Sequence, residues 1–273
     1  MRRLLVLLGL LAWTLPAFAG EFELPTLRGT ETFVPVVPVK APRWSGLYAG
    51  GQIGYNNVAV DGAGATQPLV ADMLRVLALE SEQHVSQWTV LGRGETRSIS
   101  YGGFLGYNVG WESVILGIEA SWYKLGGTID LPGNPLSRVV AAGCCTYAVT
   151  LNGNSSLAIN GYGTIKTRAG WEVGNFLPYA TIGMAVGQAS YTKSATASGT
   201  QTDSNNNVVP FSFSEGENKT GSWIYGVALG AGVDFMVMPN VFLRAEYEYA
   251  SFAKVAGIKS GINTGRVGAA IKF

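Results

Sequence analysis

The residues best suited to nucleophilic chemistry lie around His84, the only histidine of the chain. Ser81 and Ser86 flank it, and Glu80 and Glu82 are close in sequence. A catalytic relay needs a histidine that reaches the nucleophile on one side and is oriented by a carboxylate on the other, and residues so near in sequence do not easily form that geometry. We therefore expect a solvated or packed His84 and no catalytic residue, so the sequence predicts a protein that is not an enzyme.

The two cysteines, Cys144 and Cys145, are the other candidates for chemistry. Adjacent cysteines supply no disulfide framework, and a bond between them is strained because their Cβ atoms do not reach the preferred geometry. A vicinal redox switch is the alternative. One histidine and two adjacent cysteines do not make a tetrahedral metal site, and Gly230-x-Gly232 does not continue into a dinucleotide fingerprint. We expect no metal and no cofactor.

A third set consists of charged residues at alternate positions of apolar stretches. In residues 241–249, aliphatic and aromatic side chains alternate with Arg244, Glu246 and Glu248. A period of two puts the two kinds on opposite faces of a β-strand, whereas a helix would scatter the charges around its surface. The charges that this alternation places on one common side are Glu119, Lys166, Arg168, Arg244, Glu246, Glu248, Arg266 and Lys272.

Eight segments with this period can position those charges. They are residues 45–56, 99–109, 114–124, 160–171, 178–188, 221–238, 241–249 and 264–273. Most are about the 9 to 11 residues that a tilted strand needs to cross a bilayer, and the connections between them alternate between long and short, as in outer-membrane barrels. The sequence predicts an all-β fold, an eight-stranded antiparallel transmembrane up-and-down β-barrel.

The composition agrees with a membrane barrel. Charged residues make up 14% of the chain, below the roughly 25% of soluble domains. Glycine, with 37 residues, is about twice as frequent as its average share of roughly 7%. The net charge of +1 comes without a basic block, which makes nucleic acid an unsuitable partner.

The N-terminus has the features of an export signal. Arg2 and Arg3 precede an apolar run that is too short for a spanning helix, and Ala17 and Ala19 form a small-residue cleavage pattern. Residues 21–43 contain four prolines, which favour an extended tail. We predict a signal peptide in residues 1–20, a Pro-rich periplasmic tail in residues 21–43 and the outer-membrane barrel in residues 44–273.

The long connections and the strand ends give further expectations. Apolar residues at helical spacing in residues 68–90 favour a short surface helix, and residues 191–219, rich in Ser, Thr, Asn and Gly, are expected to form a solvated, mobile loop. Aromatic residues at strand ends could form the girdles at the two membrane interfaces. These are Trp44, Trp111, Trp122, Trp171, Tyr179 and Trp223.

Several motifs in this order resemble one known family. They are Trp44-Ser45-Gly46-Leu47-Tyr48-Ala49-Gly50, Gly102-Gly103-Phe104-Leu105-Gly106-Tyr107-Asn108, Thr167-Arg168-Ala169-Gly170-Trp171, Leu243-Arg244-Ala245-Glu246-Tyr247 and Arg266-Val267-Gly268. The chain is similar to the small porin-like outer-membrane β-barrels of alphaproteobacteria, which include surface antigens and opacity-type proteins. It departs from them in a long first loop, residues 57–98, and in its cysteine pair.

The resemblance implies a location in the outer membrane of a Gram-negative bacterium. The alternation of long and short connections then places both termini in the periplasm. The resemblance also implies contact with outer-membrane lipids and lipopolysaccharide, with the barrel-assembly machinery, and with peptidoglycan or host surfaces as further partners. The last strand matches the signal that the assembly machinery is expected to recognise. Its residues are Val267, Ala269, Ile271 and Phe273.

The alternating charges are expected to fill the lumen, because an eight-stranded barrel is only wide enough for its own side chains. Arg168 should then pair with Glu246 or a neighbouring carboxylate, so that Arg168→Ala weakens the fold. The alternative is a narrow ion path. The expected function is a structural surface protein with a display role and weak porin activity. A diffusion porin for small hydrophilic solutes and an adhesin or receptor acting through its loops are the alternatives.

Overall fold

The structure is a computed structural model that describes residues 43–75 and 77–273. The predicted signal peptide and all but the last residue of the predicted tail lie outside these residues. Within them, no helix combines the length and the apolar character needed to cross a membrane.

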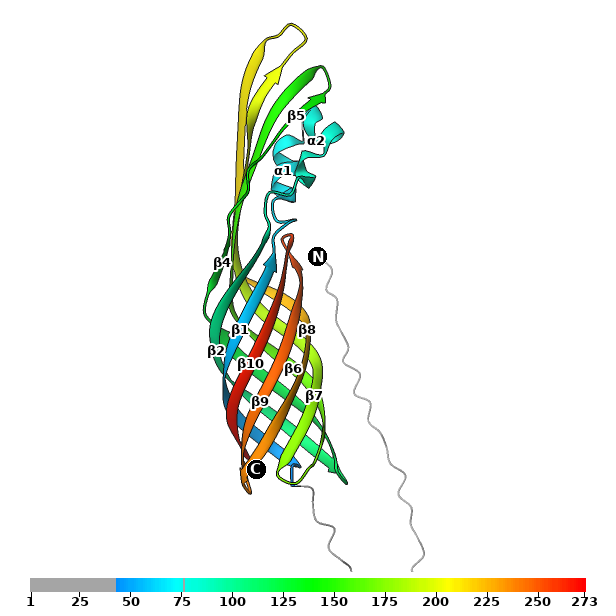
Figure 1. Ribbon diagram of the computed structural model, residues 1–273, viewed down its shortest axis with the longest axis vertical. Coiled ribbons are helices and arrows are strands. Elements are labelled where there is room, and N and C mark those ends of the chain that lie inside the picture. The colour runs from blue at the N-terminus through cyan, green and yellow to red at the C-terminus, as the bar shows by residue number, and fades with distance from the viewer. Residues whose placement is uncertain (1–42, 76) are drawn as a thin grey trace, which may run out of the picture. The chain divides into compact units, whose positions relative to one another are not determined.

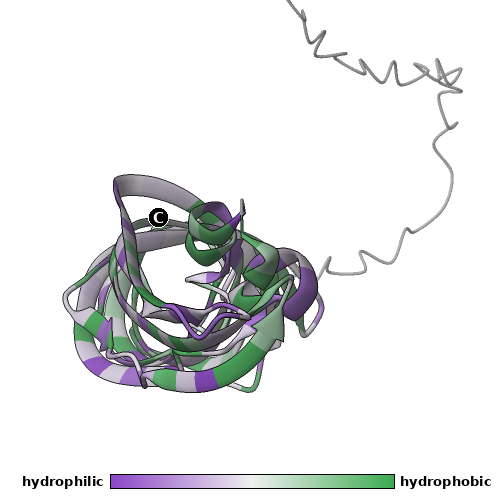
Figure 2. Cartoon of the chain, turned by 90° about the horizontal axis from the view of Figure 1, so that it is seen from above, coloured by the Kyte–Doolittle hydropathy of each residue, from purple (hydrophilic) through white to green (hydrophobic). Residues whose placement is uncertain are grey.

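Eight antiparallel strands close into a ring, because β3 pairs with β6 and β1 pairs with β10 (Figure 1). Each of the eight predicted segments overlaps one of them, which confirms the predicted fold class. Figure 2 shows the ring from above, with hydrophobic and hydrophilic residues alternating along the strands. The ring strands are β1 (Gly46–Asp61), β2 (Arg93–Trp111), β3 (Val114–Leu125), β6 (Cys145–Trp171), β7 (Phe176–Thr202), β8 (Val208–Met238), β9 (Val241–Val255) and β10 (Ile258–Lys272).

Short turns join the strands at one end of the ring. They consist of residues 112–113, 172–175 and 239–240. Glu112 and Gly174 adopt left-handed backbone conformations in two of them, with φ of 54° and 60°. At the other end, Ala256 and Gly257 make a two-residue turn between β9 and β10, and both have positive φ, as tight hairpins require.

The strands β6, β7 and β8 run on past the ring (Figure 1). Residues 145–159, 189–202 and 208–222 of these strands, with β4 (Thr128–Leu131) and β5 (Leu136–Ala142), continue the same sheet beyond the ring, and we call this part the extension. The prediction of a mobile loop at residues 191–219 was therefore wrong. One face of these residues is buried, because Tyr191, Ala195 and Ala197 pack against a core.

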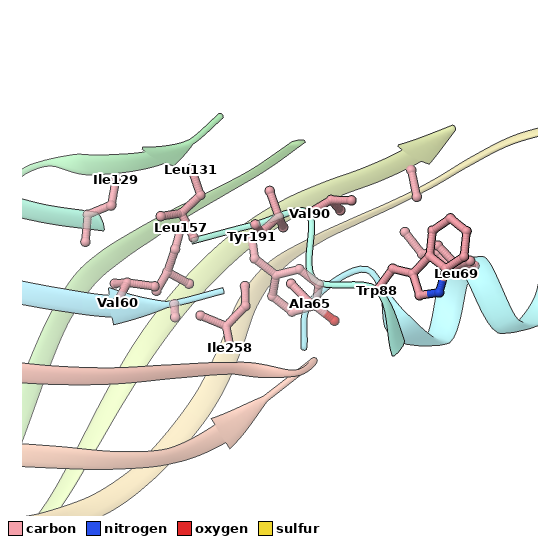
Figure 3. Packing of buried hydrophobic residues seen from close by; sticks show 14 of the residues in the cluster. Val60, Ala65, Leu69, Trp88, Val90, Ile129, Leu131, Leu157, Tyr191 and Ile258 are labelled. Carbon is pink, nitrogen blue, oxygen red and sulfur yellow. The ribbon is translucent and has the colours of Figure 1, made fainter. Parts of the chain in front are cut away.

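The first long connection supplies the other side of that core. It contains α1 (Gln67–Leu74), α2 (Ala78–Gln83) and the short 3-10 helix η1 (Val85–Gln87), so helix is present where it was predicted. Leu69, Leu74 and Trp88 are buried against strand residues such as Leu157 and Tyr191. Figure 3 shows part of this cluster, with labelled side chains from the connection and from β1, β4, β6, β7 and β10.

The outer surface of the ring is apolar. On β7, Ile182 and Met184 are 61% and 70% exposed. Trp111, Trp122, Trp171 and Trp223 also face outward, in agreement with the predicted girdle positions. Trp44 and Tyr179 were wrongly assigned to the girdles, since they are 1% and 6% exposed. Trp44 packs edge-on against Phe242, and Tyr179 occupies an inward position on β7.

Candidate functional site

The lumen holds most of the charges that alternation placed together. Glu119 comes from β3, Lys166 and Arg168 from β6, Arg266 from β10, and the remaining ones from β9. The side chains brought together are Glu119, Lys166, Arg168, Arg244, Glu246, Glu248 and Arg266, and none of these residues is more than 4% exposed. Buried charges of this number require close pairing.

Lys272 does not join them, contrary to the prediction. It lies at the end of β10, and its ammonium donates to the carbonyl oxygen of Arg43 at 2.8 Å. The strand alternation gave the direction of the Lys272 side chain. Its position along the barrel axis, however, places it at the barrel mouth instead of in the lumen.

One half of the network surrounds Asp234 on β8. Arg244 donates from Nε to Oδ1 at 2.8 Å and from Nη2 to Oδ2 at 3.1 Å. Arg168 Nη2 donates to the same Oδ2 at 2.7 Å. The partner of Arg168 is thus a neighbouring lumen carboxylate, not Glu246. Arg244 also donates to Glu119 Oε2 at 2.6 Å, which links β9 to β3 across the lumen.

The other half surrounds Lys166. Its Nζ lies 2.7 Å from Glu246 Oε1 and 2.9 Å from Glu248 Oε2, with Glu119 Oε1 at 3.6 Å. Arg266 approaches the same two glutamates of β9, at 3.2 Å and 2.9 Å. Glu119 contacts cations in both halves and so joins them into one network.

The network is balanced in charge. Four cations, Lys166, Arg168, Arg244 and Arg266, meet four carboxylates, Glu119, Asp234, Glu246 and Glu248. With all eight ionised, the formal sum is zero. A ring of one sign would favour counter-ions in a pore, whereas here each charge lies beside at least one charge of the opposite sign.

Tyrosines complete the packing. Tyr48 and Tyr179 donate hydroxyl hydrogens to Glu119 and Glu246 at 2.8 Å and 2.9 Å, and Tyr162 contacts Glu248 and Arg266. The guanidinium of Arg168 lies 3.9 Å from the ring centroid of Tyr179, a favourable cation–π distance.

Inward-facing glycines leave room for these large side chains. A Cβ on Gly232 would lie 2.6 Å from the hydroxyl oxygen of Tyr179, and one on Gly106 would overlap Tyr48. Glycine in these strands therefore lets the tyrosines lie across the lumen. At this level the lumen is occupied by buried polar and aromatic side chains that contact one another.

The sequence reasoning missed four members of this cluster. Asp234 was not counted with the lumen charges, and Tyr179 was assigned to a girdle. Tyr48 and Tyr162 were not singled out. All four lie at the inward positions of their strands, so the two-residue period of the sequence is the signal that could have identified them.

The proposed assembly residues lie along β10 and at its end. Val267, Ala269 and Ile271 face outward, and the terminal Phe273 is exposed as well. They share the apolar outer surface of the ring and have no part in the lumen network.

The other candidates for chemistry lie outside the lumen, in the first long connection and at the turn between β5 and β6. His84 is exposed, while Ser86 Oγ donates to Glu80 at 2.5 Å. Cys144 and Cys145 form a disulfide at the turn between β5 and β6, although the sequence had favoured no bond there. Across residues 43–75 and 77–273, no group of His, Cys, Asp and Glu side chains is arranged to hold a metal ion.

Comparison with known proteins places this geometry in context. A family model described as "Outer membrane protein beta-barrel domain" matches residues 5–273. No curated protein matches the chain.

Three solved structures illustrate the similarity. Neisserial surface protein A has 15% sequence identity and a TM-score of 0.41, and the match covers 84% of this chain and 98% of that one. Ail, the attachment invasion locus protein of Yersinia pestis, solved with the heparin analogue sucrose octasulfate, has 15% identity, a TM-score of 0.32 and coverages of 84% and 99%. OprG from Pseudomonas aeruginosa has 9% identity, a TM-score of 0.34 and coverages of 84% and 96%.

Proposed function

The chain belongs to the family of outer-membrane β-barrel proteins, and we propose that it is a structural surface protein whose closed barrel anchors the extension for display. Its location is the outer membrane of a Gram-negative bacterium. The proposal concerns what the protein does there.

The filled lumen is the observation that carries the proposal. Eight charged side chains lie across it in close ion pairs, and each is at least 96% buried. Removing one partner of such a pair leaves a buried charge, so a path for solutes would need several pairs to separate together. This supports a scaffold over a diffusion pore, and it leaves at most weak porin activity.

The extension supports the display role. Its hydrophobic core joins strands and helices, so it is built to hold a fixed surface. Since outer-membrane barrels place short turns in the periplasm and long connections outside, the extension would face the exterior and both termini the periplasm. The signal peptide, residues 1–20, and the periplasmic tail, residues 21–43, belong to the same proposal.

No enzymatic step is part of this proposal. The exposed His84 and the Ser86–Glu80 hydrogen bond do not supply the nucleophile, base and orienting acid that acyl transfer needs. Binding through the extension is the function that follows from display. Contacts with the barrel-assembly machinery through Val267, Ala269, Ile271 and Phe273, and with peptidoglycan or host surfaces, remain parts of the proposal.

Single-channel conductance of the refolded protein in a planar bilayer tests the scaffold role. A gel-mobility shift on boiling confirms that the barrel is folded. We expect no stable ohmic steps from the folded protein. The double variant Lys166→Ala/Glu246→Ala, which removes one charge of each sign, is the control for an opened lumen. Regular steps from the unchanged protein would overturn the scaffold role and support the diffusion pore.

Protease treatment of intact cells tests the orientation. The turn at residues 203–207 at the far end of β7 and β8 should be cut from outside. Protection in intact cells together with cleavage after the outer membrane is opened would contradict the proposed orientation.

A further inference from the structure

The extension has two faces of different chemistry. One face packs on the helices. The other, which we call the outer polar face, consists of alternate residues of β6, β7 and β8 together with residues of β4 and β5. Its hydroxyl and amide side chains are Thr146, Thr150, Asn152, Asn154 and Ser156 of β6, Ser190, Thr192, Ser194, Thr196, Ser198, Thr200 and Thr202 of β7, and Ser212, Ser214 and Asn218 of β8.

Register makes this face one surface. Directly opposite residues of an antiparallel pair lie on the same side of a sheet, and Asn152, Thr196 and Ser214 are such partners across three strands. Hydroxyl groups of neighbouring strands already contact one another, at 3.1 Å between Thr196 and Ser214. The groups are thus held in place before any ligand arrives.

Charge lies almost entirely on the opposite face. Lys193, Glu217 and Lys219 lie on the helix side of β7 and β8, as their pairing with one another and with Tyr191 shows. On the outer polar face of the described extension strands, Asp130 of β4 is the single ionisable residue. A solvated surface normally carries about 25–35% charged residues, so a surface of neutral donors and acceptors calls for another explanation.

A groove opens on the same face. It has a volume of about 310 Å³ and is lined by Asp130, Asn154, Ser156, Thr192 and Ser194, among others. Hydroxyls, a carboxamide and one carboxylate converge there. These groups can both donate to and accept from the hydroxyl groups of a sugar.

On β7 the outer polar face continues the outer surface of the barrel, which faces lipid. The even-numbered residues of β7 point outward along the strand. They include Ile182 and Met184, which face the lipid, and continue as Thr192 and the alternate residues that follow it. From Ser190 to Thr202 this face extends about 40 Å at strand rise. The molecules beside this part of the strand are therefore the polar portions of the lipids that surround its lower part.

From these observations we propose that the outer polar face binds uncharged saccharide chains, and that in the membrane these are the sugars of the surrounding outer-leaflet glycolipid. The inference rests on the proposed orientation in one respect only, which is that the outer polar face lies outside the cell. Binding by the purified protein can be tested without it, so failure here and failure of the display role are distinguishable.

Threonine-methyl NMR of the refolded protein in detergent micelles tests the proposal. The probes are an uncharged O-chain oligosaccharide released from lipopolysaccharide, which lacks the lipid and the anionic core, and maltoheptaose as an unrelated neutral sugar. Methyl signals of Thr192, Thr196 and Thr200 should shift with the dose of O-chain oligosaccharide. Those of the buried lumen residues Thr164 and Thr264 should not, and they serve as internal controls.

The triple variant Thr192→Val/Thr196→Val/Thr200→Val removes three hydroxyls and keeps the side-chain shape. It should bind the O-chain oligosaccharide about tenfold more weakly. Thr167→Val, on the lipid-facing side of β6, is the matched control and should bind as the unchanged protein does. A response to maltoheptaose alone would support a saccharide surface but overturn the glycolipid as its source. Unshifted methyl signals with both sugars, or equal binding by the triple variant, would overturn the proposal.

Discussion

Asp234 and Arg244 are direct register partners on β8 and β9 and also form a two-point ion pair inside the barrel, at 2.8 Å and 3.1 Å. The pair therefore fixes the register of two strands and closes the lumen with the same contacts. Arg168 from β6 shares the aspartate, so three strands depend on one buried carboxylate.

Replacing Arg244 by alanine should destabilise the barrel strongly. Asp234 and Glu119 would both lose a buried cation, and breaking such a pair costs about 3–5 kcal/mol. Urea unfolding in detergent micelles, followed by the gel-mobility shift, measures the change. Arg97→Ala at an exposed position is the control and should alter the free energy of unfolding by less than about 0.5 kcal/mol. An unchanged unfolding midpoint for Arg244→Ala would contradict the network.

A double-mutant cycle should assign the partner of Arg168. Coupling between Arg168→Ala and Asp234→Ala should be on the order of 1–3 kcal/mol, as for residues in direct contact. Coupling of Arg168→Ala with Glu248→Ala should be much smaller, because Glu248 pairs with Lys166 and Arg266 instead. Equal coupling energies in the two cycles would disprove the division of the network into halves.

Gly232→Ala should destabilise the folded barrel by about 1–3 kcal/mol, a typical cost of overpacking. The new methyl group would meet Tyr179 and the carbonyl oxygen of Ala245, at 2.6 Å and 2.7 Å. Gly265→Ala is the matched control, since nothing lies within 4 Å of a Cβ there. Similar unfolding curves for the two variants would show that the lumen is not tightly packed around Tyr179.

The carboxyl group of Glu217 should titrate below its ordinary value. Lys193 and Tyr191 donate to it, at 2.9 Å and 2.7 Å, and the hydrogen bond from Lys193 is the main reason why the pKa of Glu217 is lowered. Because the folded pKa lies below the unfolded one, this interaction contributes fully above the unfolded value and is lost as the pH falls through the folded value. Carboxyl NMR should show the pKa of Glu217 rising in Lys193→Ala. A pKa that stays the same in that variant would argue against the ion pair.

Leu74→Ala should loosen the extension and leave the barrel folded. Leu74 is fully buried in the core shared by helices and strands, where such a truncation costs about 2–5 kcal/mol. Faster proteolysis of the extension with an unchanged gel-mobility shift is the expected result. Val139→Ala, at an exposed position of β5, should leave the cleavage rate unchanged. Loss of the gel shift in Leu74→Ala would mean that the extension and the barrel fold as one unit.

The barrel could be predicted from the sequence because lipid on one side and a packed lumen on the other impose a strong contrast between alternate residues. In β9, for example, the charged Arg244 and Glu246 point into the lumen, whereas the apolar Leu243 and Ala245 point outward. The extension lacks that contrast. In residues 190–202, the outward positions are Ser and Thr, and the inward ones include the small Ala195 and Ala197. Hydropathy therefore hardly varies along the strand, and the segment resembles a polar loop.

Irregular register hid the length of the strands as well. A bulge between Ile159 and Gly161 changes which residues of β6 face inward, so the alternation of the barrel portion does not continue into the extension. Pairing within the lumen was equally hard to predict. Glu119 and Arg244, for example, are 125 residues apart in the sequence. Alternation gives the direction of each side chain, but it does not give the position along the barrel axis or the residue with which the side chain pairs.

The extension differs from the barrel in having free edges. Residues 208–222 of β8 pair with β7 on one side, whereas pairing with β9 begins only at Gly226. An unpaired strand edge can template the addition of a second chain and so lead to aggregation. Pro210 lies on this edge strand, followed by Glu215, Glu217 and Lys219, and both proline and charge disfavour strand addition. The β8 edge is thereby protected against self-association where copies of the protein are crowded side by side in one membrane.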